Sequence, residues 1–199
     1  MKDQFFNLMK WMTHKAEGRR FILGVDGLSR SGKTTLVEKI TRRLSFAHVP
    51  VYVFHIDDLI TASTSRYHTG YPEWYEYYYL QWEVDYLTKQ LFQKIRTSES
   101  LQLLIYNAEE DEQTMHTIFL PSSCVVIIEG VFLQRKEWRG YFDYLVYLNC
   151  SREIRFKREK ETTQRNFCKF INRYWKAEDF YLKTEKPLSS ADHVIHIKT

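Results

Sequence analysis

Apolar runs and amphipathic stretches alternate along most of this 199-residue chain. Short runs dominated by aliphatic and aromatic residues predict strands that are covered on both faces, as in a parallel sheet. Such runs occupy residues 21–26, 49–56, 124–129, 144–148 and 193–198. The segments between them have the pattern of helices. These predicted helices are residues 32–44, 73–96, 151–161 and 166–184.

Strands separated by helices predict an α/β fold with a doubly wound, mainly parallel sheet and helices on both faces. In such a fold, ligands bind at the carboxyl ends of the strands. Residues 101–108 and 114–120 predict a further pair of short strands around a polar segment. No internal repeat or low-complexity linker divides the chain, so we expect residues 1–199 to form a single domain.

Residues 1–18 carry Phe5, Leu8, Met9 and Met12 at helical spacing. This spacing predicts an amphipathic helix packed on the domain, because the apolar face of a helix is usually covered by core. Attachment of this helix to a membrane surface is the alternative. No apolar run is long enough for a signal peptide or a membrane span, which predicts a cytoplasmic protein without a membrane partner.

The composition is that of a globular protein, with 44% hydrophobic and 27% charged residues. A net charge of +4 suits a phosphate-bearing ligand, but it is too small and too mixed with acids to predict a nucleic-acid partner. The three cysteines lack the spacing of a metal site, so we expect reduced thiols.

The most informative segment is GLSRSGKTT at residues 27–35, which matches the phosphate-binding pattern G-x-x-x-x-G-K-[ST]. Its two glycines allow a tight turn whose backbone N–H groups converge on phosphate oxygens, and the following helix directs its positive end at the same anion. Lys33 can reach the β- and γ-phosphates, and the Thr34 hydroxyl can bind Mg²⁺. The predicted ATP-binding residues in this loop are Gly27, Ser29, Arg30, Ser31, Gly32, Lys33, Thr34 and Thr35.

The flanking strand and helix make a P-loop NTPase-type fold the expected context for this motif. A GTPase should carry an N-K-x-D motif, and the chain has none. A motor ATPase usually has an apolar strand that ends in Asp-Glu, whereas the strand here ends in Glu129 and Gly130. The pattern therefore favours a small kinase.

Several segments together resemble the uridine kinase and phosphoribulokinase-like family of P-loop kinases. The resemblance extends from about residue 21 to residue 195 and implies transfer of the ATP γ-phosphate to a small-molecule hydroxyl. Its segments are GVDGLSRSGKTT, HIDDLI, VVIIEGVFL, YFDYLVYLNCSREIRFKRE and FINRYWKAEDFYLKTEKPLSSADHVI.

The resemblance implies roles for two acids. Asp57 matches the carboxylate that activates the acceptor hydroxyl near Mg²⁺, with Asp58 as the competing candidate one residue later. Glu129 matches the metal-proximal carboxylate, and an acid at the end of so apolar a run is costly unless it meets a cation or a partner. His55 shares a strand face with Asp57 and can line the same crevice, or it can be a hydrogen-bonded structural residue.

The basic segment 151–165 corresponds to the lid of the family. Arg155 and Arg158 match its lid arginines, whose guanidinium groups would neutralise charge in the transition state. Arg165 matches the arginine before the closing helix and is therefore a predicted ATP-binding residue. The segment departs from the family pattern by carrying Glu159 in place of a second arginine, and each arginine could instead belong to a solvated helix face.

The acceptor site is where the resemblance fails, because the family motif N-F-D-H-P-D-A-F-D has no clear counterpart. An aromatic-rich stretch, residues 67–82, stands in its place. We predict Tyr71, Glu73 and Glu76 as acceptor-binding residues, together with Asp57 and Asp58. The alternative is that the aromatic residues of this stretch form a core-facing helical stripe.

The sequence thus predicts an ATP- and Mg²⁺-dependent kinase of a nucleoside or a related hydroxyl compound. Two alternatives remain open. One is a kinase of a non-nucleoside alcohol such as pantothenate, and the other is an ATP-binding regulatory protein that has lost its acceptor site. A homo-oligomer is compatible with either.

Overall fold

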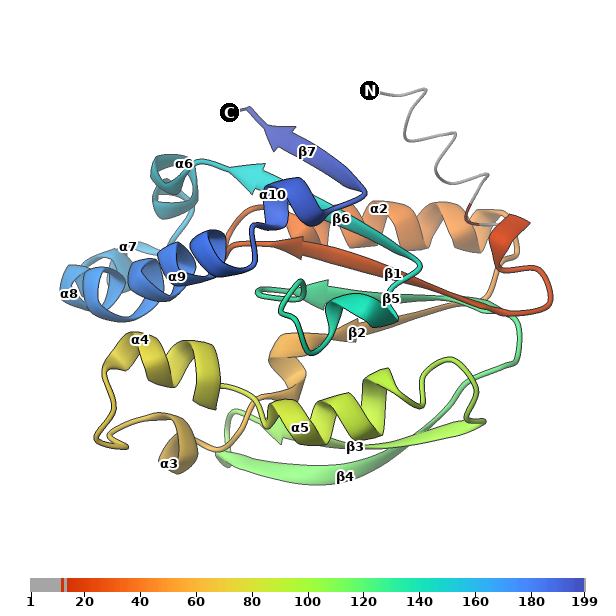
Figure 1. Cartoon of the computed structure of the whole chain (residues 1–199), viewed down its shortest axis with the longest axis horizontal. Helices are drawn as coiled ribbons and strands as arrows, with labels where there is room; N and C mark the ends of the chain where they lie inside the picture. The colour runs from red at the N-terminus through yellow and green to blue at the C-terminus, as the bar shows by residue number, and fades with distance from the viewer. Residues whose placement is uncertain (1–11, 13, 199) are drawn as a thin grey trace.

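The computed structural model describes Met12 and residues 14–198 (Figure 1). Five parallel strands form the central sheet, in the order β2-β5-β1-β6-β7. They are β1 (Arg20–Gly27), β2 (Val51–His55), β5 (Cys124–Gly130), β6 (Tyr144–Cys150) and β7 (His193–Ile197). All five predicted central strands are confirmed, with ends that differ by one or two residues.

The sheet separates two hydrophobic layers, as a doubly wound fold requires. Phe21 and Leu23 of β1 point towards α2 (Lys33–Phe46), where they join Val37 and Ile40. Ile22, between them, belongs to the opposite layer. Because neighbouring strand residues face opposite sides, strands covered on both faces carry apolar residues at every position, which explains their unbroken apolar sequence.

The opposite layer is rich in aromatic side chains and is built by several short helices. These are α3 (Ser63–Arg66), α4 (Glu73–Tyr75) with a π-helical continuation Glu76–Leu80, and α5 (Val84–Leu87) with a continuation Thr88–Phe92. The predicted helix 73–96 is therefore divided at residues 81–83. The division turns Trp82 into the core, where its indole Nε1 donates a hydrogen bond of 2.7 Å to the Ile56 carbonyl oxygen.

The predicted pair of short strands is confirmed as an antiparallel hairpin of β3 (Ser100–Asn107) and β4 (Glu112–Phe119). Figure 1 shows this hairpin below α5, apart from the central sheet. One face of β3 contributes Leu101 and Leu103 to the core, whereas β4 is mostly exposed.

The C-terminal segment closes the aromatic layer. Its helices are α6 (Arg152–Lys157), α7 (Glu161–Gln164), α8 (Phe167–Lys169), a π-helical stretch Phe170–Trp175, α9 (Lys176–Thr184) and α10 (Pro187–Ser190). The predicted helix 166–184 is continuous, but the predicted helix 151–161 ends at Lys157. Most of the predicted N-terminal helix 1–18 lies outside the described residues. Within the described part of that segment, Met12 is buried.

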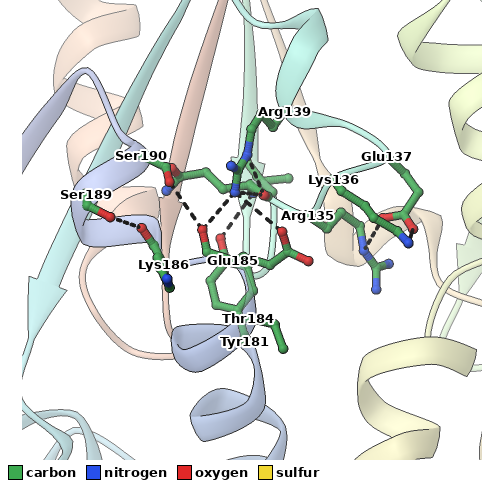
Figure 2. A network of polar contacts seen from close by, with 12 residues as sticks. Arg135, Lys136, Glu137, Arg139, Tyr181, Thr184, Glu185, Lys186, Ser189 and Ser190 are labelled. Atoms are coloured by element: carbon green, nitrogen blue, oxygen red, sulfur yellow. Dashed lines mark hydrogen bonds and ion pairs between the residues drawn. The ribbon is translucent and has the colours of Figure 1, made fainter.

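Arg139 ties the end of α9 to the segment that follows β5 (Figure 2). Its guanidinium donates 2.8 Å hydrogen bonds to the carbonyl oxygens of Gln134 and Glu185 and lies 3.4 Å from the Glu185 carboxylate. One cation therefore pairs with backbone groups from both segments, which keeps α9 against the sheet.

Two further sequence-based expectations can be compared with the fold. The thiols of Cys124, Cys150 and Cys168 are all free, as expected. In the part of the chain that the structure describes, no helix has both the length and the apolar character needed to cross a membrane.

Trp82 provides a test of the divided helix. We expect Trp82→Ala to lower the free energy of unfolding by about 3–5 kcal/mol, because it leaves a large cavity in the core and an unpaired Ile56 carbonyl. Chemical denaturation measures the change. Phe119→Ala, at a 73% exposed position, is the matched control and should change stability by about 0.5 kcal/mol or less. A similar loss in both variants would contradict the packing described for residues 81–83.

Candidate active site

The loop between β1 and α2 has the geometry of a phosphate cradle. Gly27 has φ +154°, and a Cβ there would lie 2.7 Å from Ser31 Oγ and 3.0 Å from the Leu148 carbonyl oxygen. Gly32, with φ +99°, immediately precedes α2. Glycine is required by the close approach at Gly27 and by the positive φ at both positions, so the spacing of the motif follows from the turn itself.

A buried acid anchors this loop, and the sequence analysis assigned it no role. Asp26 Oδ1 accepts a 2.8 Å hydrogen bond from the Gly27 N–H, while Oδ2 accepts bonds of 2.5 Å from the Tyr181 hydroxyl and 2.9 Å from Gln134 Nε2. Burial raises the pKa of Asp26, and these hydrogen bonds oppose the rise. The signal in the sequence is an aspartate within an otherwise apolar strand.

Lys33 begins α2 and turns back towards the loop, where Nζ lies 3.3 Å from the Leu28 carbonyl oxygen. Burial lowers the pKa of Lys33, and the carboxylates of Glu129, Asp57 and Asp26 oppose that shift. The cation is thus held among carboxylates at the edge of the sheet where three strands end.

Glu129 is at the end of β5, where Oε1 accepts hydrogen bonds from the Thr34 hydroxyl (3.0 Å) and from His55 (2.7 Å). Its second oxygen, Oε2, is buried and has no hydrogen-bond partner among the described residues. A carboxylate oxygen and a hydroxyl side by side are ligands that suit Mg²⁺. No group of three or more His, Cys, Asp or Glu in the described part of the chain could hold a metal, so phosphate oxygens and water would have to complete the coordination.

Asp57 lies in the 3₁₀ turn Ile56–Leu59 that follows β2. Its side chain is exposed and lines two cavities. Partial loss of hydration raises the pKa of Asp57; Lys33 opposes this rise, whereas Glu129 and Asp58 add to it. Asp58 lines neither cavity.

The larger cavity has a volume of about 1950 Å³ and extends from the phosphate loop along α2 to β7. It brings together most of the predicted phosphate and metal ligands. Those that line it are Ser29, Arg30, Ser31, Gly32, Lys33, Thr34, Thr35, Asp57, Glu129 and Arg158. Gly27 forms the turn beneath them.

The smaller cavity has a volume of about 310 Å³, and Asp57 also lines it. It shares Ser29, Arg30, Asp57 and Tyr77 with the larger one. Its remaining lining residues come from the aromatic layer and the C-terminal helices, and they include Tyr67, Gln81, Arg155, Phe156, Phe170, Tyr174, Trp175 and Glu178. Sequence reasoning missed most of these, although they lie in the aromatic-rich stretch and in the family-like C-terminal segments, because no spacing along the chain shows which side chains of those segments meet.

The predicted lid arginines have different surroundings. Arg155 is buried and forms a bidentate ion pair with Glu178 (2.6 and 2.8 Å), and it also donates to the Ser29 carbonyl oxygen. Arg158 lines the larger cavity and donates a 3.0 Å hydrogen bond to the Arg30 carbonyl oxygen. Arg165 is exposed and lines neither cavity, so its position does not support the predicted ATP contact.

The predicted acceptor residues require a correction. Glu76 is buried, accepts two 2.9 Å hydrogen bonds from Thr69 and pairs with Arg173 at 2.8 Å, so its carboxylate is fully used inside the protein. Tyr71 is 56% exposed, and Glu73 is also on the surface. Neither they nor Glu76 line either cavity.

With this geometry established, comparison with known proteins identifies the family. The profile of the Phosphoribulokinase / Uridine kinase family matches residues 22–166. The chain belongs to this family. The family predicted from the sequence is thus confirmed, and so is the P-loop kinase fold.

Several similar proteins carry the name of this family. A uridine kinase of Borrelia duttonii is 27% identical over 149 residues, which are 70% of this chain and 66% of that protein. A uridine kinase of Limosilactobacillus reuteri is 25% identical over 153 residues and is likewise matched over 66% of its length. A solved structure described as a possible uridine kinase from Bacillus stearothermophilus is 45% identical, with a TM-score of 0.81, and is covered over 99% of its length.

Lys33 tests the phosphate cradle. We expect Lys33→Ala to abolish most ATP binding while the fold is retained, because this side chain contributes charge at the loop and little packing. Isothermal titration with ATP and Mg²⁺ measures the affinity, and circular dichroism measures the fold. Thr41→Ala, at a position on α2 that lines neither cavity, is the control. Unchanged ATP affinity in Lys33→Ala would refute the assignment of the loop.

Glu76 tests the correction to the acceptor site. We expect Glu76→Gln to lower the free energy of unfolding by about 3 kcal/mol, because it leaves the buried Arg173 guanidinium without a counter-charge. Thermal and chemical unfolding measure the loss. The exposed Glu73→Gln should leave stability unchanged, and equal stability of the two variants would argue against a structural role for Glu76.

Proposed function

We propose that this chain is an ATP-dependent kinase that phosphorylates a hydroxyl group of a nucleoside. The observation that carries the proposal is that Asp57 lines both cavities. One cavity contains the phosphate loop, and the other is small, aromatic and suited to a second substrate. The names of the relatives favour a nucleoside as that second substrate.

ATP would occupy the larger cavity, which exceeds the 300–1000 Å³ that is usual for small-molecule sites. The loop N–H groups, the start of α2 and Lys33 would bind its phosphates. Thr34 and Glu129 would hold Mg²⁺, directly or through water, and the unpaired Oε2 supports this role. When bound, the metal ion would neutralise part of the negative charge on the phosphates.

In the proposed reaction, the acceptor oxygen attacks the γ-phosphorus in line with the bond to the β–γ bridging oxygen. The new O–P bond forms as the bridging bond breaks, ADP leaves, and the hydroxyl proton passes to the Asp57 carboxylate. Asp57 is the better candidate for this base, since Asp58 faces neither cavity. A carboxylate with a raised pKa accepts a proton more readily than an ordinary aspartate.

The two lid arginines would act differently. Arg158 lines the larger cavity and can reach a nucleotide phosphate by a change of rotamer. Arg155 is engaged by Glu178 and by the Ser29 carbonyl, so it would position the phosphate loop and not contact the transferred group.

The rival functions are less well supported. A regulatory protein that has lost its acceptor site would need no cavity beside Asp57, and no named relative points to a pantothenate-type acceptor. A location in the cytoplasm, the absence of nucleic-acid partners and a single domain of 199 residues remain predictions, as does a homo-oligomer. ADP release from ATP, measured with a panel of nucleosides and with pantothenate, tests the proposal directly.

The two neighbouring acids give the sharpest test. Asp57→Asn keeps the size of the side chain but removes the base, so turnover should fall roughly 10²–10⁴-fold while ATP affinity changes little. Asp58→Asn should retain nearly full turnover. Coupled measurement of ADP release, with a titration of ATP binding, separates the two effects. If Asp58→Asn instead carries the large loss, the assignment is displaced by one residue.

A further inference from the structure

Arg30 has an unusual backbone conformation in the phosphate loop. Its φ is +60°, in the left-handed region that glycine adopts readily and that a residue with a Cβ disfavours. Arginine is not one of the residue types that are enriched at such positions. When a residue at a ligand site keeps an unfavourable backbone conformation, the use of its side chain is the best explanation.

The side chain of Arg30 has a distinctive position as well. Arg30 lines both cavities, and among the described residues it is the only Lys or Arg that does so. Asp57, the proposed base, is the only Asp or Glu in the same part of the chain that lines both. A phosphoryl group that moves from ATP in the larger cavity to an acceptor in the smaller one must pass the residues that the cavities share. A cation there meets this group while negative charge is spread over its equatorial oxygens.

A carboxylate holds the Arg30 guanidinium. Nε donates a 3.0 Å hydrogen bond to Oε2 of Glu159, whose side chain is only 10% exposed. The Glu159 backbone is fixed in turn, because its carbonyl oxygen accepts a 3.0 Å hydrogen bond from Gln164 Nε2. Within the described part of the chain, Nη1 and Nη2 of Arg30 make no hydrogen bond. The contact therefore orients the guanidinium and leaves its terminal edge available for phosphate oxygens.

A purely structural ion pair explains these observations less well. An exposed pair contributes little to stability, so it gives little reason to keep an arginine at φ +60°. The basic segment 151–165 is also joined to the phosphate loop by two other arginines. Arg155 donates to the Ser29 carbonyl oxygen, and Arg158 donates to that of Arg30. The Arg30 side chain is thus not needed to hold this segment against the loop.

We propose that Arg30 is a catalytic residue whose guanidinium contacts the transferred phosphoryl group, and that Glu159 is a positioning residue that orients it. The proposal rests on the proposed kinase function and adds a source of charge stabilisation to it. Nη1 and Nη2 donate to the equatorial oxygens as the bond to ADP breaks, and no covalent bond to the arginine forms. Because the group lies between the cavities only during transfer, the contact is stronger in the transition state than with bound ATP, so it raises kcat more than ATP affinity.

Steady-state assays with uridine, cytidine and adenosine, combined with calorimetric titration of ATP and Mg²⁺, test the catalytic role. Arg30→Gln should lower kcat at least about 100-fold, with the ATP Kd within about threefold of wild type. Arg19→Gln is the matched control and should behave as wild type. Arg19 has the same side-chain exposure of 47%, is also paired with a carboxylate, and lines neither cavity.

A double-mutant cycle tests the positioning role. Glu159→Gln should lower kcat about tenfold with little change in the ATP Kd, since the guanidinium stays but no carboxylate holds it. Combined with Arg30→Gln, it should add almost nothing, because its effect passes through Arg30. Additive losses would show that Glu159 acts independently and would overturn its assignment.

Arg30→Gly separates catalysis from structure. Glycine adopts φ +60° freely, so the Tm without ligand should stay within about 3 °C of wild type while kcat falls as in Arg30→Gln. A larger fall in Tm would indicate a structural role and overturn the inference. So would an active wild type whose Arg30→Gln variant keeps its kcat or loses ATP affinity alone, and the kinase function would then stand. A wild type that phosphorylates no member of the panel would overturn both.

Discussion

The carboxylate of Asp26 is enclosed at the carboxyl end of β1, where it has no access to water. A buried carboxylate is tolerated only when hydrogen-bond donors surround it, and the donors here come from three separate parts of the chain. Gly27 begins the phosphate loop, Gln134 follows β5, and Tyr181 belongs to α9. The need to satisfy one acid therefore fixes the loop relative to the sheet and to the closing helix.

The same helix braces the loop a second time. Glu178 is one turn before Tyr181 and holds Arg155, which in turn donates to the carbonyl oxygen of Ser29 in the loop. Arg139 secures the far end of α9 through Glu185 (Figure 2). A preorganised loop needs no rearrangement when phosphate binds, and this is the property on which electrostatic stabilisation of phosphoryl transfer depends.

The segment that stands in the place of the family's acceptor motif departs from the family pattern, whereas the phosphate loop keeps it. The phosphate loop has the pattern of the family, but the helix that should bear the acceptor motif divides at residues 81–83. At that division Trp82 is buried and Gln81 lines the small cavity, while Glu76, one turn earlier, is held in an ion pair with Arg173. The chain thus combines a phosphate loop typical of its family with a small neighbouring cavity that is lined mainly by aromatic and C-terminal residues.

The sequence alone predicted the elements that depend on interactions between residues close together in the chain. The apolar runs predicted all five central strands, and the glycine spacing predicted the turn at Gly27 and Gly32, because a close approach and a positive φ leave no other residue type. The acid pair after β2 and Glu129 at the end of β5 were placed at the correct edge of the sheet, since parallel strands end there together.

Only the tertiary structure decided which of these side chains meet. Asp57 lines both cavities, whereas its neighbour Asp58 lines neither. Glu76 lies before the helix break and pairs with Arg173, whereas Gln81 lies in the break and lines the small cavity. Arg155 differs from Arg158 because it has an ion-pair partner, Glu178, 23 residues along the chain. Helical periodicity alone predicted one continuous helix over 73–96. It gives no sign that the helix is interrupted at residues 81–83, where Trp82 is buried in the core. Contacts between distant segments, such as those of Asp26 with Gln134 and Tyr181, have no signature in the local pattern, because their energy depends on three-dimensional proximity and not on spacing along the chain.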